Sequence, residues 1–305
     1  MKIVVVGSSN TDMIIKVPRI PRPGETILGG TFSTAAGGKG ANQAVAAARA
    51  GGDVTFIARV GDDMFGEQAR RGFEADQIDV KYVKIDKTEP SGVALIFVDE
   101  TGENSIAVAS GANVSLSPED VNEAAEVIKQ ADILLMQLET PLETVRRAAE
   151  IAKQSGVKVI LNPAPACPLD DALLATLTII TPNESEAELL TGIPVNDVPD
   201  AEKAAIALLD RGLEVVTVTL GSKGALLKTR ELTTIVPGFK VKAVDATAAG
   251  DVFNGSLAVA IAEGKSLEES VRFANAAAAL SVTKLGAQPS APKREEIERM
   301  LQKSD

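Results

Sequence analysis

The sequence contains no histidine and a single cysteine, and these two shortages exclude many common catalytic and metal-binding chemistries. Without histidine there is no Ser-His-Asp hydrolysis, no histidine-ligated zinc and no imidazole acid or base. Cys167 alone can form neither an internal disulfide nor a cysteine metal cluster, and we expect it to be a small buried apolar residue. Any proton transfer must therefore use a carboxylate, a lysine, a tyrosine or water.

The chain is also poor in clustered positive charge and in long apolar runs. Lysine and arginine total 31 against 42 aspartate and glutamate residues, a formal net charge of −11 at pH 7, and no basic run is present that would neutralise a row of phosphates. The first apolar run ends at Gly7, which is too short for a signal peptide or a membrane span. We therefore expect a cytoplasmic protein that binds neither nucleic acid nor membranes.

The 305 residues, of which 45% are apolar, suffice for one large domain with an extensive core. Short β-branched runs alternate with alanine-rich segments of helical period, which is typical of parallel strands linked by helices. The predicted strands cover residues 4–6, 54–58, 132–138, 157–162, 177–181 and 215–220, and the chain from Ala248 onward is predicted to be helical. We expect a three-layer α/β/α sandwich with a mostly parallel central sheet, formed by residues 1–305 as a single domain.

Two segments interrupt this alternation. Residues from about 11 to 34 and from about 91 to 110 have the pattern of paired strands, and the second pair is joined by the turn DETGEN. Together they predict a small β-sheet inserted in the large domain, where it would act as a lid.

A glycine-rich loop at residues 36–42, AGGKGAN, precedes the first long helical segment. It is not a Walker loop, because Ser33 stands where that motif has glycine and Gly40 where it has serine or threonine. Glycines at a helix N-terminus let backbone amides approach a polar ligand, and Lys39 and Asn42 add donors that suit hydroxyl oxygens. By itself the loop is equally consistent with a turn that packs a helix closely.

A second run of small residues, VDATAAGD at 244–251, joins a predicted strand at 241–244 to a helix. The small side chains of Ala248, Ala249 and Gly250 would leave the amides of the first helical turn bare and ready to hold phosphate charge. Asp251 stands beside them, where a carboxylate would accept the proton of an attacking hydroxyl during phosphoryl transfer. The alternative is an ordinary aspartate that stabilises the start of a helix.

The motifs GGKGAN and DATAAGD together resemble the two signatures of the ribokinase-like (pfkB) carbohydrate kinases. The segments GSSNTD, TPNESE, TLGSKG and KLGAQPS also follow the order of that family, so the resemblance covers essentially the whole chain. It implies the ribokinase-like fold with a β lid, and transfer of the γ-phosphoryl group of ATP to the 5-hydroxyl of D-ribose. Deoxyribose, fructose or a nucleoside are alternative acceptors within this fold, and a non-catalytic sugar-binding regulator is an alternative of another class.

The resemblance also implies roles for individual residues. Those expected to bind the sugar are Asn10, Asp12, Gly38, Lys39, Asn42, Glu139 and the catalytic base Asp251, with an anion hole at Ala248, Ala249 and Gly250. Those expected to bind ATP and its Mg²⁺ are Asn183, Glu186, Thr219, Gly221, Ser222, Gly224, Gly250 and Asn275. Plain structural alternatives are a helix cap for Glu139, a polar helix start for Asn183 and Glu186, a simple turn for 219–224, and an exposed helical position for Asn275.

The family further implies an activating monovalent cation, K⁺, beside the anion hole. The matching positions are Asp245, Thr247, Ser281, Lys284, Gly286 and Ser290, most of which would bind through backbone carbonyls. The apolar faces of TDMIIKV and VALIFV suit a homodimer joined through the lids. The chain departs from the family pattern at Ala246 and Val252, where hydroxyl residues are frequent, and the missing hydroxyl at 246 would weaken the ordering of the anion-hole turn.

The residue types present favour a free polyol among the possible acceptors. The expected sugar set is polar, and the chain has no tryptophan and one tyrosine, which leaves little aromatic surface for a nucleobase. A sugar-binding regulator has no need of the base Asp251, and no helix-turn-helix or basic appendage is evident.

Overall fold

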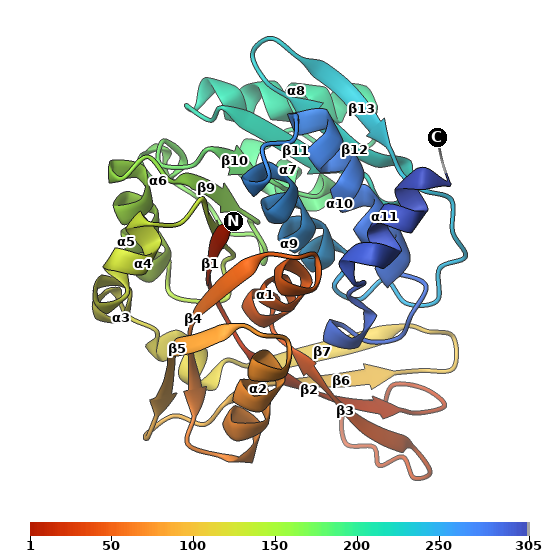
Figure 1. The fold of residues 1–305 in the computed structure, drawn as a ribbon. Helices are drawn as coiled ribbons and strands as arrows, with labels where there is room; N and C mark the ends of the chain where they lie inside the picture. The colour runs from red at the N-terminus through yellow and green to blue at the C-terminus, as the bar shows by residue number, and fades with distance from the viewer. Residues whose placement is uncertain (304–305) are drawn as a thin grey trace.

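The centre of the molecule is a nine-stranded sheet, formed within residues 1–303, which are the residues that the computed structural model describes (Figure 1). Its strands are β1 Lys2–Val6, β4 Asp53–Gly61, β5 Asp79–Asp86, β8 Ile133–Met136, β9 Lys158–Leu161, β10 Ile179–Ile180, β11 Val215–Thr219, β12 Gly224–Lys228 and β13 Thr233–Pro237. Their order across the sheet is β13-β12-β11-β10-β9-β8-β1-β4-β5. All neighbouring pairs from β11 to β5 are parallel, and β12 and β13 add an antiparallel edge. The predicted mostly parallel sheet is confirmed.

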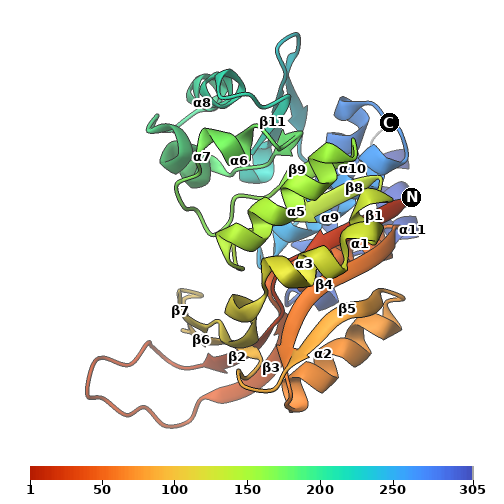
Figure 2. The same ribbon diagram turned by 90° about the vertical axis from the view of Figure 1, so that its left-hand side faces the viewer.

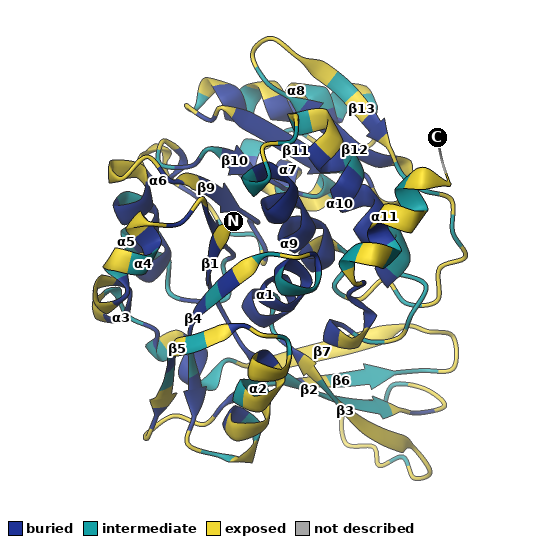
Figure 3. Ribbon diagram, in the orientation of Figure 1, coloured by how far each residue is buried: buried dark blue, intermediate teal, exposed yellow. Residues whose placement is uncertain are grey.

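Helices cover both faces of this sheet, and each face has its own buried apolar cluster (Figures 2 and 3). One face carries α1 Lys39–Arg49, α2 Met64–Ala75, α9 Ala249–Ala262, α10 Leu267–Ser281 and α11 Arg294–Gln302. The other carries α3 Pro118–Glu123, α4 Ala125–Lys129, α5 Leu142–Gln154, α6 Asp171–Leu174, α7 Glu184–Thr191 and α8 Val198–Asp210. Because both faces are covered, β1 is apolar at successive positions, with Val4 and Val5 packed into opposite clusters.

A separate four-stranded sheet forms the lid. Its strands are β2 Asn10–Lys16, β3 Thr31–Gly37, β6 Gly92–Val98 and β7 Asn104–Ala109, in the order β3-β2-β6-β7. The lid projects from the body at the lower right of Figure 1, and β7 and most of β3 are exposed in Figure 3. Its two halves fall where the sequence predicts them.

The structure differs from the sequence predictions at several places. Residues 241–244 form no strand, because this segment is largely exposed and its amides bond to a loop rather than to the sheet, as in the bond from Val244 N–H to the Val282 carbonyl at 2.7 Å. Strands β5, β12 and β13 were not predicted. Cys167 is partly rather than fully buried, at the edge of one core cluster. In residues 1–303 no helix has the length and apolar character needed to cross a membrane.

Candidate active site

The carboxyl ends of β1 and β8 lie side by side where the strand order of the sheet reverses. In the central sheet β1 lies between β4 and β8. The chain runs from β1 to β4 on one side, and β8, which comes later in the sequence, is added on the other side. Open α/β sheets bind ligands at such a point because the loops that leave the two strands diverge there. Ser8, just after β1, donates from its Oγ to Glu139 Oε2, just after β8, at 2.5 Å. The predicted sugar residue Glu139 therefore lies at the switch point of the sheet.

The GGKGAN loop brings the start of α1 against this edge. Gly40 permits the contact, because a Cβ there would lie 2.4 Å from the backbone nitrogen of Ser8. The helix has no side-chain cap at its N-cap residue Gly38, and the Lys39 backbone N–H donates to Glu139 Oε2 at 3.0 Å. One oxygen of Glu139 thus caps α1 from a distant loop, so the helix-cap interpretation describes part of its role.

Asp251 lies in the first turn of α9 and is 5% exposed. Its Oδ2 accepts a hydrogen bond from Asn42 Nδ2 and its Oδ1 accepts one from Gln43 Nε2, both at 2.9 Å. Gly255 lets α9 approach α1 this closely, because a Cβ there would lie 2.5 Å from the Gln43 carbonyl oxygen. Burial raises the pKa of Asp251, while Lys39 and the two amides act against that rise. A raised pKa suits a carboxylate that accepts a proton near neutral pH.

The turn before α9 presents backbone N–H groups to the same space. Ala248 adopts the left-handed conformation at φ 59° and adds no side-chain cap to the helix. Within residues 1–303 the N–H groups of Gly250 and Asp251 have no acceptor, whereas that of Ala249 donates to the Ala246 carbonyl at 3.2 Å. Bare amides at the positive end of a helix dipole suit an anion, although the Ala249 amide is engaged within the turn. Ala246 therefore contributes to this turn through its carbonyl without a side-chain hydroxyl.

Charged groups gather at the sugar end of the site. The carboxylate of Asp12 lies directly over Gly37, where an added Cβ would come within 2.4 Å of its Oδ1. Burial raises the pKa of Asp12 to about 6, and the charges of Glu139 and Asp251 add to this rise. Burial would lower the pKa of Lys39, but surrounding carboxylates, led by Asp251 and Glu139, raise it above its ordinary value. Four of the predicted sugar residues thus interact through their charges.

A hollow of about 200 Å³ opens on the other side of Asp251. The predicted residues that line it are Lys39, Asn183, Glu186, Thr219, Ala248, Ala249, Gly250 and Asp251. Asn183 and Glu186 form a reciprocal cap at the start of α7, with bonds of 2.8 and 2.9 Å. Four other predicted ATP residues do not line this hollow, namely Gly221, Ser222, Gly224 and Asn275. Asn275 is buried rather than exposed, and it donates to the Val236 carbonyl at 3.0 Å.

The predicted cation residues lie in two segments, 245–247 and 281–290, the second of which begins at the last residue of α10, and Asp245 ties the two together. Its Oδ1 accepts from the Thr247 N–H and its Oδ2 from the Gly286 N–H, both at 2.9 Å. Partial burial by itself would raise the pKa of Asp245, but these bonds hold that pKa below its ordinary value. The ammonium of Lys284 pairs with a carboxylate of α11 at 3.0 Å, so it is engaged away from Asp245. The remaining two members donate from their hydroxyls to nearby carbonyls, Ser281 to Ala278 and Ser290 to Ala287.

Several buried amides and hydroxyls that the sequence analysis did not single out join the site. Gln43 Nε2 donates to Asn162 Oδ1 at 3.1 Å as well as to the base. Thr181 Oγ1 donates to Asn254 Oδ1 at 2.6 Å, and Asn254 Nδ2 donates to the Gly250 carbonyl at 2.8 Å. Asn162 and Thr181 directly follow β9 and β10, so the rule that ligands bind beyond the carboxyl ends of parallel strands would have found both.

Asn113 is a further residue that was not predicted, and it holds the predicted sugar residue Asn10. Its Nδ2 donates to Asn10 Oδ1 at 2.7 Å, and its Oδ1 accepts from the Ser9 N–H at 2.8 Å. These bonds occupy the oxygen of Asn10, which leaves its NH₂ group as the donor available to a ligand.

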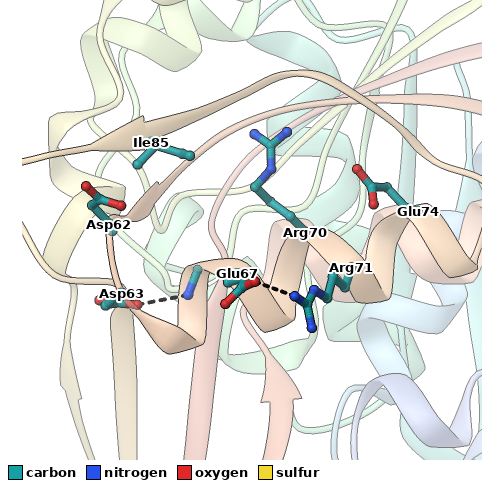
Figure 4. A pocket seen from close by; sticks show the side chains of 9 residues that line it. Asp62, Asp63, Glu67, Arg70, Arg71, Glu74 and Ile85 are labelled. Carbon is teal, nitrogen blue, oxygen red and sulfur yellow. Dashed lines mark hydrogen bonds and ion pairs between the residues drawn. The ribbon is translucent and has the colours of Figure 1, made fainter.

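A second hollow, of about 350 Å³, lies beside α2 and away from all of these residues (Figure 4). Asp63 caps α2 by accepting from the N–H groups of its first turn, and Arg71 pairs with Glu67. Arg70 donates to the Val83 carbonyl at 2.6 Å. We place the candidate site at Asp251, because residues predicted from the motifs line the hollow there and none of them lines this one.

Comparisons with known proteins identify the family of this chain. The model of the pfkB family carbohydrate kinases matches residues 1–294. A ribokinase of Haemophilus influenzae is 50% identical over 300 residues, covering 98% of each chain, and a deoxyribokinase of Salmonella typhimurium is 42% identical over 302 residues, covering 99% of each. The solved structure of Arabidopsis thaliana ribokinase complexed with ribose and ATP is 36% identical, covers 98% of each chain and has a TM-score of 0.92.

Proposed function

This chain belongs to the pfkB family of carbohydrate kinases, and we propose that it transfers the γ-phosphoryl group of ATP to the 5-hydroxyl of D-ribose, giving D-ribose 5-phosphate and ADP. The observation that carries the proposal is the position of Asp251. It is buried between the charged sugar end and the hollow, is held by two amides, and stands beside the bare N–H groups at the start of α9.

In the proposed reaction Asp251 accepts the proton of the 5-hydroxyl as that oxygen attacks the γ-phosphorus. The bond from the γ-phosphorus to the β,γ-bridging oxygen breaks, and ADP leaves with the electron pair. The N–H groups of Gly250 and Asp251 would hold the charge that builds on the transferring oxygens. Closure of the lid would exclude water, which otherwise competes as the acceptor.

Asn42 supports a sugar site on the lid side of the base. Its Nδ2 is engaged by Asp251, and its Oδ1 is buried without a partner in residues 1–303. A buried oxygen without a partner costs stability, and a ligand hydroxyl would satisfy it. The free NH₂ of Asn10 and the charged groups of Asp12, Lys39 and Glu139 offer further partners to the hydroxyls of a polyol. Gly38, the N-cap of α1, would let the backbone approach the sugar closely.

The hollow beside Asp251 is the proposed site of the ATP phosphates. Among residues 1–303 no group of three or more acidic or cysteine side chains is arranged to hold a metal ion. Mg²⁺ usually binds to nucleotide phosphates and one or two carboxylates, and the Glu186 carboxylate from α7 lines this hollow, where it would hold the ion. When bound, Mg²⁺ would neutralise phosphate charge. The turn at Gly221, Ser222 and Gly224, with Thr219 and Asn275, is the proposed adenosine end.

A monovalent cation fits the two loops joined by Asp245. Its carboxylate is fixed by the Thr247 and Gly286 amides, and the carbonyl oxygens of these loops are of the type that K⁺ binds. The hydroxyls of Ser281 and Ser290 already donate to backbone carbonyls. These two residues would therefore bind the cation through their own carbonyl oxygens. Bound K⁺ would stabilise the turn that carries the anion-binding amides.

We also propose that two copies of the chain associate through their lids. Large apolar side chains are exposed on both faces of this sheet, with Phe32 65%, Leu95 49% and Ile106 54% exposed. Residues 95 and 106 lie on opposite faces, because Leu95 pairs with Ala107 across the strands. A four-stranded sheet with two apolar faces needs a cover, and the lid of a second copy provides a matching one.

Deoxyribose is the rival acceptor that a specific observation favours, since a deoxyribokinase is also a close relative. A coupled ADP-release assay with ribose, 2-deoxyribose, fructose and adenosine separates the candidates. We expect the highest kcat/KM with ribose. A higher kcat/KM with another acceptor would make that acceptor, rather than ribose, the proposed substrate. No ADP release with any of the four would favour a non-catalytic sugar-binding protein.

A further inference from the structure

Gln43 contacts Asp251 but is fully buried and does not line the hollow assigned to the nucleotide phosphates. Its Nε2 donates one N–H to Asp251 Oδ1 at 2.9 Å and the other to Asn162 Oδ1 at 3.1 Å. Its Oε1 accepts from Gln137 Nε2 at 2.6 Å. Each polar atom of this amide is therefore engaged by protein, and none is left for a substrate.

We propose that Gln43 is a positioning residue for the catalytic base: it fixes the Asp251 carboxylate and sets the pH at which that carboxylate becomes able to accept a proton. The inference rests on the proposed role of Asp251. Since an N–H donated to a carboxylate stabilises its ionised form, loss of the Gln43 amide would make Asp251 a stronger base that is ionised over a narrower pH range.

The network gives the Gln43 amide a single orientation. If the amide were flipped, its oxygen would face Asp251 Oδ1 and its NH₂ would face the Nε2 of Gln137, so that two acceptors and two donors would oppose each other. Gln137 directly follows β8 and is itself fully buried, packed against Gly7, where an added Cβ would lie 2.1 Å from its Oε1. The base is thus connected through two glutamines to the central sheet.

Asn42 and Gln43 are neighbours in sequence with different tasks. Asn42 bonds one carboxylate oxygen and keeps a free oxygen of its own, whereas Gln43 bonds the other carboxylate oxygen and has no free atom. Substitution of Asn42 should therefore weaken sugar binding, and substitution of Gln43 should change turnover with little effect on the KM for the sugar.

Other charged groups around Asp251 also affect its pKa. Lys39 from α1 favours the ionised form of the base, and Glu139 after β8 opposes it. Asp12 on β2 and Glu186 on α7 also lie close enough for mutual repulsion with Asp251. Removal of the Gln43 amide leaves all four in place, so the direction of the shift is upward.

The test is the pH dependence of kcat at saturating ribose and ATP. In Gln43→Leu we expect the acidic limb to move up by about one pH unit, with a loss of turnover at pH 6 that is largely recovered at pH 8. Gln43→Glu, which keeps the shape but adds a second carboxylate, should move the limb further in the same direction. Thr176→Val, which removes a hydroxyl bond just before β10, at the amino end of the parallel strands and so at the opposite edge from the site, should leave the limb unchanged.

A limb at the wild-type position in Gln43→Leu or Gln43→Glu would overturn the inference, whatever the effect on stability. Gln43→Glu carries the test if the leucine variant does not fold. Asp251→Asn is measured alongside. If that variant keeps near-normal turnover, the proposed base is wrong and the role of Gln43 falls with it; if it is inactive while the Gln43 variants keep the wild-type limb, only the role of Gln43 is wrong.

Discussion

The central sheet and the lid are built from similar apolar strands, but they differ in what covers them. In β1 the residues from Ile3 to Val6 are buried on both faces, whereas β7 is exposed along its whole length. Because helices cover this sheet, α1 packs against α9 there, and Asn42 and Gln43 of α1 hold Asp251 of α9 in one fixed network. The strands β7 and most of β3 lack such a cover within residues 1–303, which is why we propose a second copy as the cover of the lid.

This difference separates two kinds of contribution to catalysis. The proposed base and anion-binding amides lie on the sheet side, so they should act independently of association. The proposed sugar residues Asn10 and Asp12 lie on the lid strand β2, so their effect should depend on lid closure. The predictions below test this division, beginning with the largest expected effect.

Replacement of the proposed base tests the sheet side of the comparison. Asp251→Asn keeps the shape of the side chain, so we expect the fold and most of the sugar affinity to persist while turnover falls by roughly 10² to 10⁴, the usual scale for loss of a general base. Steady-state kinetics and a thermal melt check this result. Near-normal turnover in a folded variant would contradict the assignment.

Asn42→Ala tests a group on the sheet side that faces the sugar. A lost hydrogen bond to a buried hydroxyl costs about 1–3 kcal/mol, so the KM for ribose should rise roughly 5- to 150-fold while the KM for ATP changes little. Both constants are measured in one assay series. Equal damage to the two substrates would place Asn42 elsewhere in the site.

Charged substitutions on the lid test the proposal that a second copy of the chain covers it. Leu95→Asp and Ile106→Asp place a carboxylate on each face, and burial of an unpaired charge is costly, so at least one should weaken the dimer about 10-fold or more. Light scattering across a dilution series gives the dissociation constant. Ile206→Asp on α8, exposed but on the sheet body, is the matched control. A monomeric wild type at micromolar concentration would remove the dimer altogether.

The sequence predicted the elements that obey a strong local pattern. Strands β1, β4, β8, β9, β10 and β11 are short and mainly apolar, and all six were expected. The antiparallel edge was missed because it lies outside the alternation of strands and helices, and β13 buries only Val236. The strand expected at 241–244 is wrong because this segment is largely exposed and its Val244 N–H bonds to the Val282 carbonyl after α10 rather than to a sheet.

The candidate site could be predicted only where a motif carries it. Lys39, Asn42 and Asp251 lie in motifs that resemble family signatures, and the structure brings them together. Gln43 was missed, although it adjoins Asn42, because its partner Asp251 is 208 positions away and only the packing of α1 on α9 shows the contact. Likewise, the sequence could not show that the Ala249 N–H already bonds to the Ala246 carbonyl, because residue types do not specify the local turn geometry.

The lid carboxylate Asp12 predicts a pH effect on the KM for ribose, whereas the base Asp251 should affect the pH dependence of kcat. Its pKa is raised to about 6, so ionised Asp12 accepts sugar hydroxyls above that pH, and the KM for ribose should rise about 10-fold between pH 7 and pH 5. The ordinary value is 3.8, so the protonated form stabilises the fold at low pH and this stability is lost as the pH rises through 6. Asp12→Asn should therefore raise the unfolding free energy at pH 8 by about 1–3 kcal/mol. Unchanged stability there would contradict the raised pKa.

The smallest effect expected is activation by a monovalent cation, which would act on the sheet side without contacting either substrate. Asp245 joins the turn that precedes α9 to the loop at Gly286, and a large, weakly hydrated cation bound by carbonyl oxygens would hold this turn in the form that presents its amides. The assay replaces tetramethylammonium chloride stepwise with KCl at constant ionic strength. It should show a saturable rise in kcat with little change in the KM for ribose. Asp245→Ala should abolish the rise, whereas the lid variant Ile106→Asp should retain it, because the Asp245 carboxylate is held by the Thr247 and Gly286 amides and not by β7. Equal rates across the salt series would refute the cation site and leave the anion-binding turn ordered by its own hydrogen bonds.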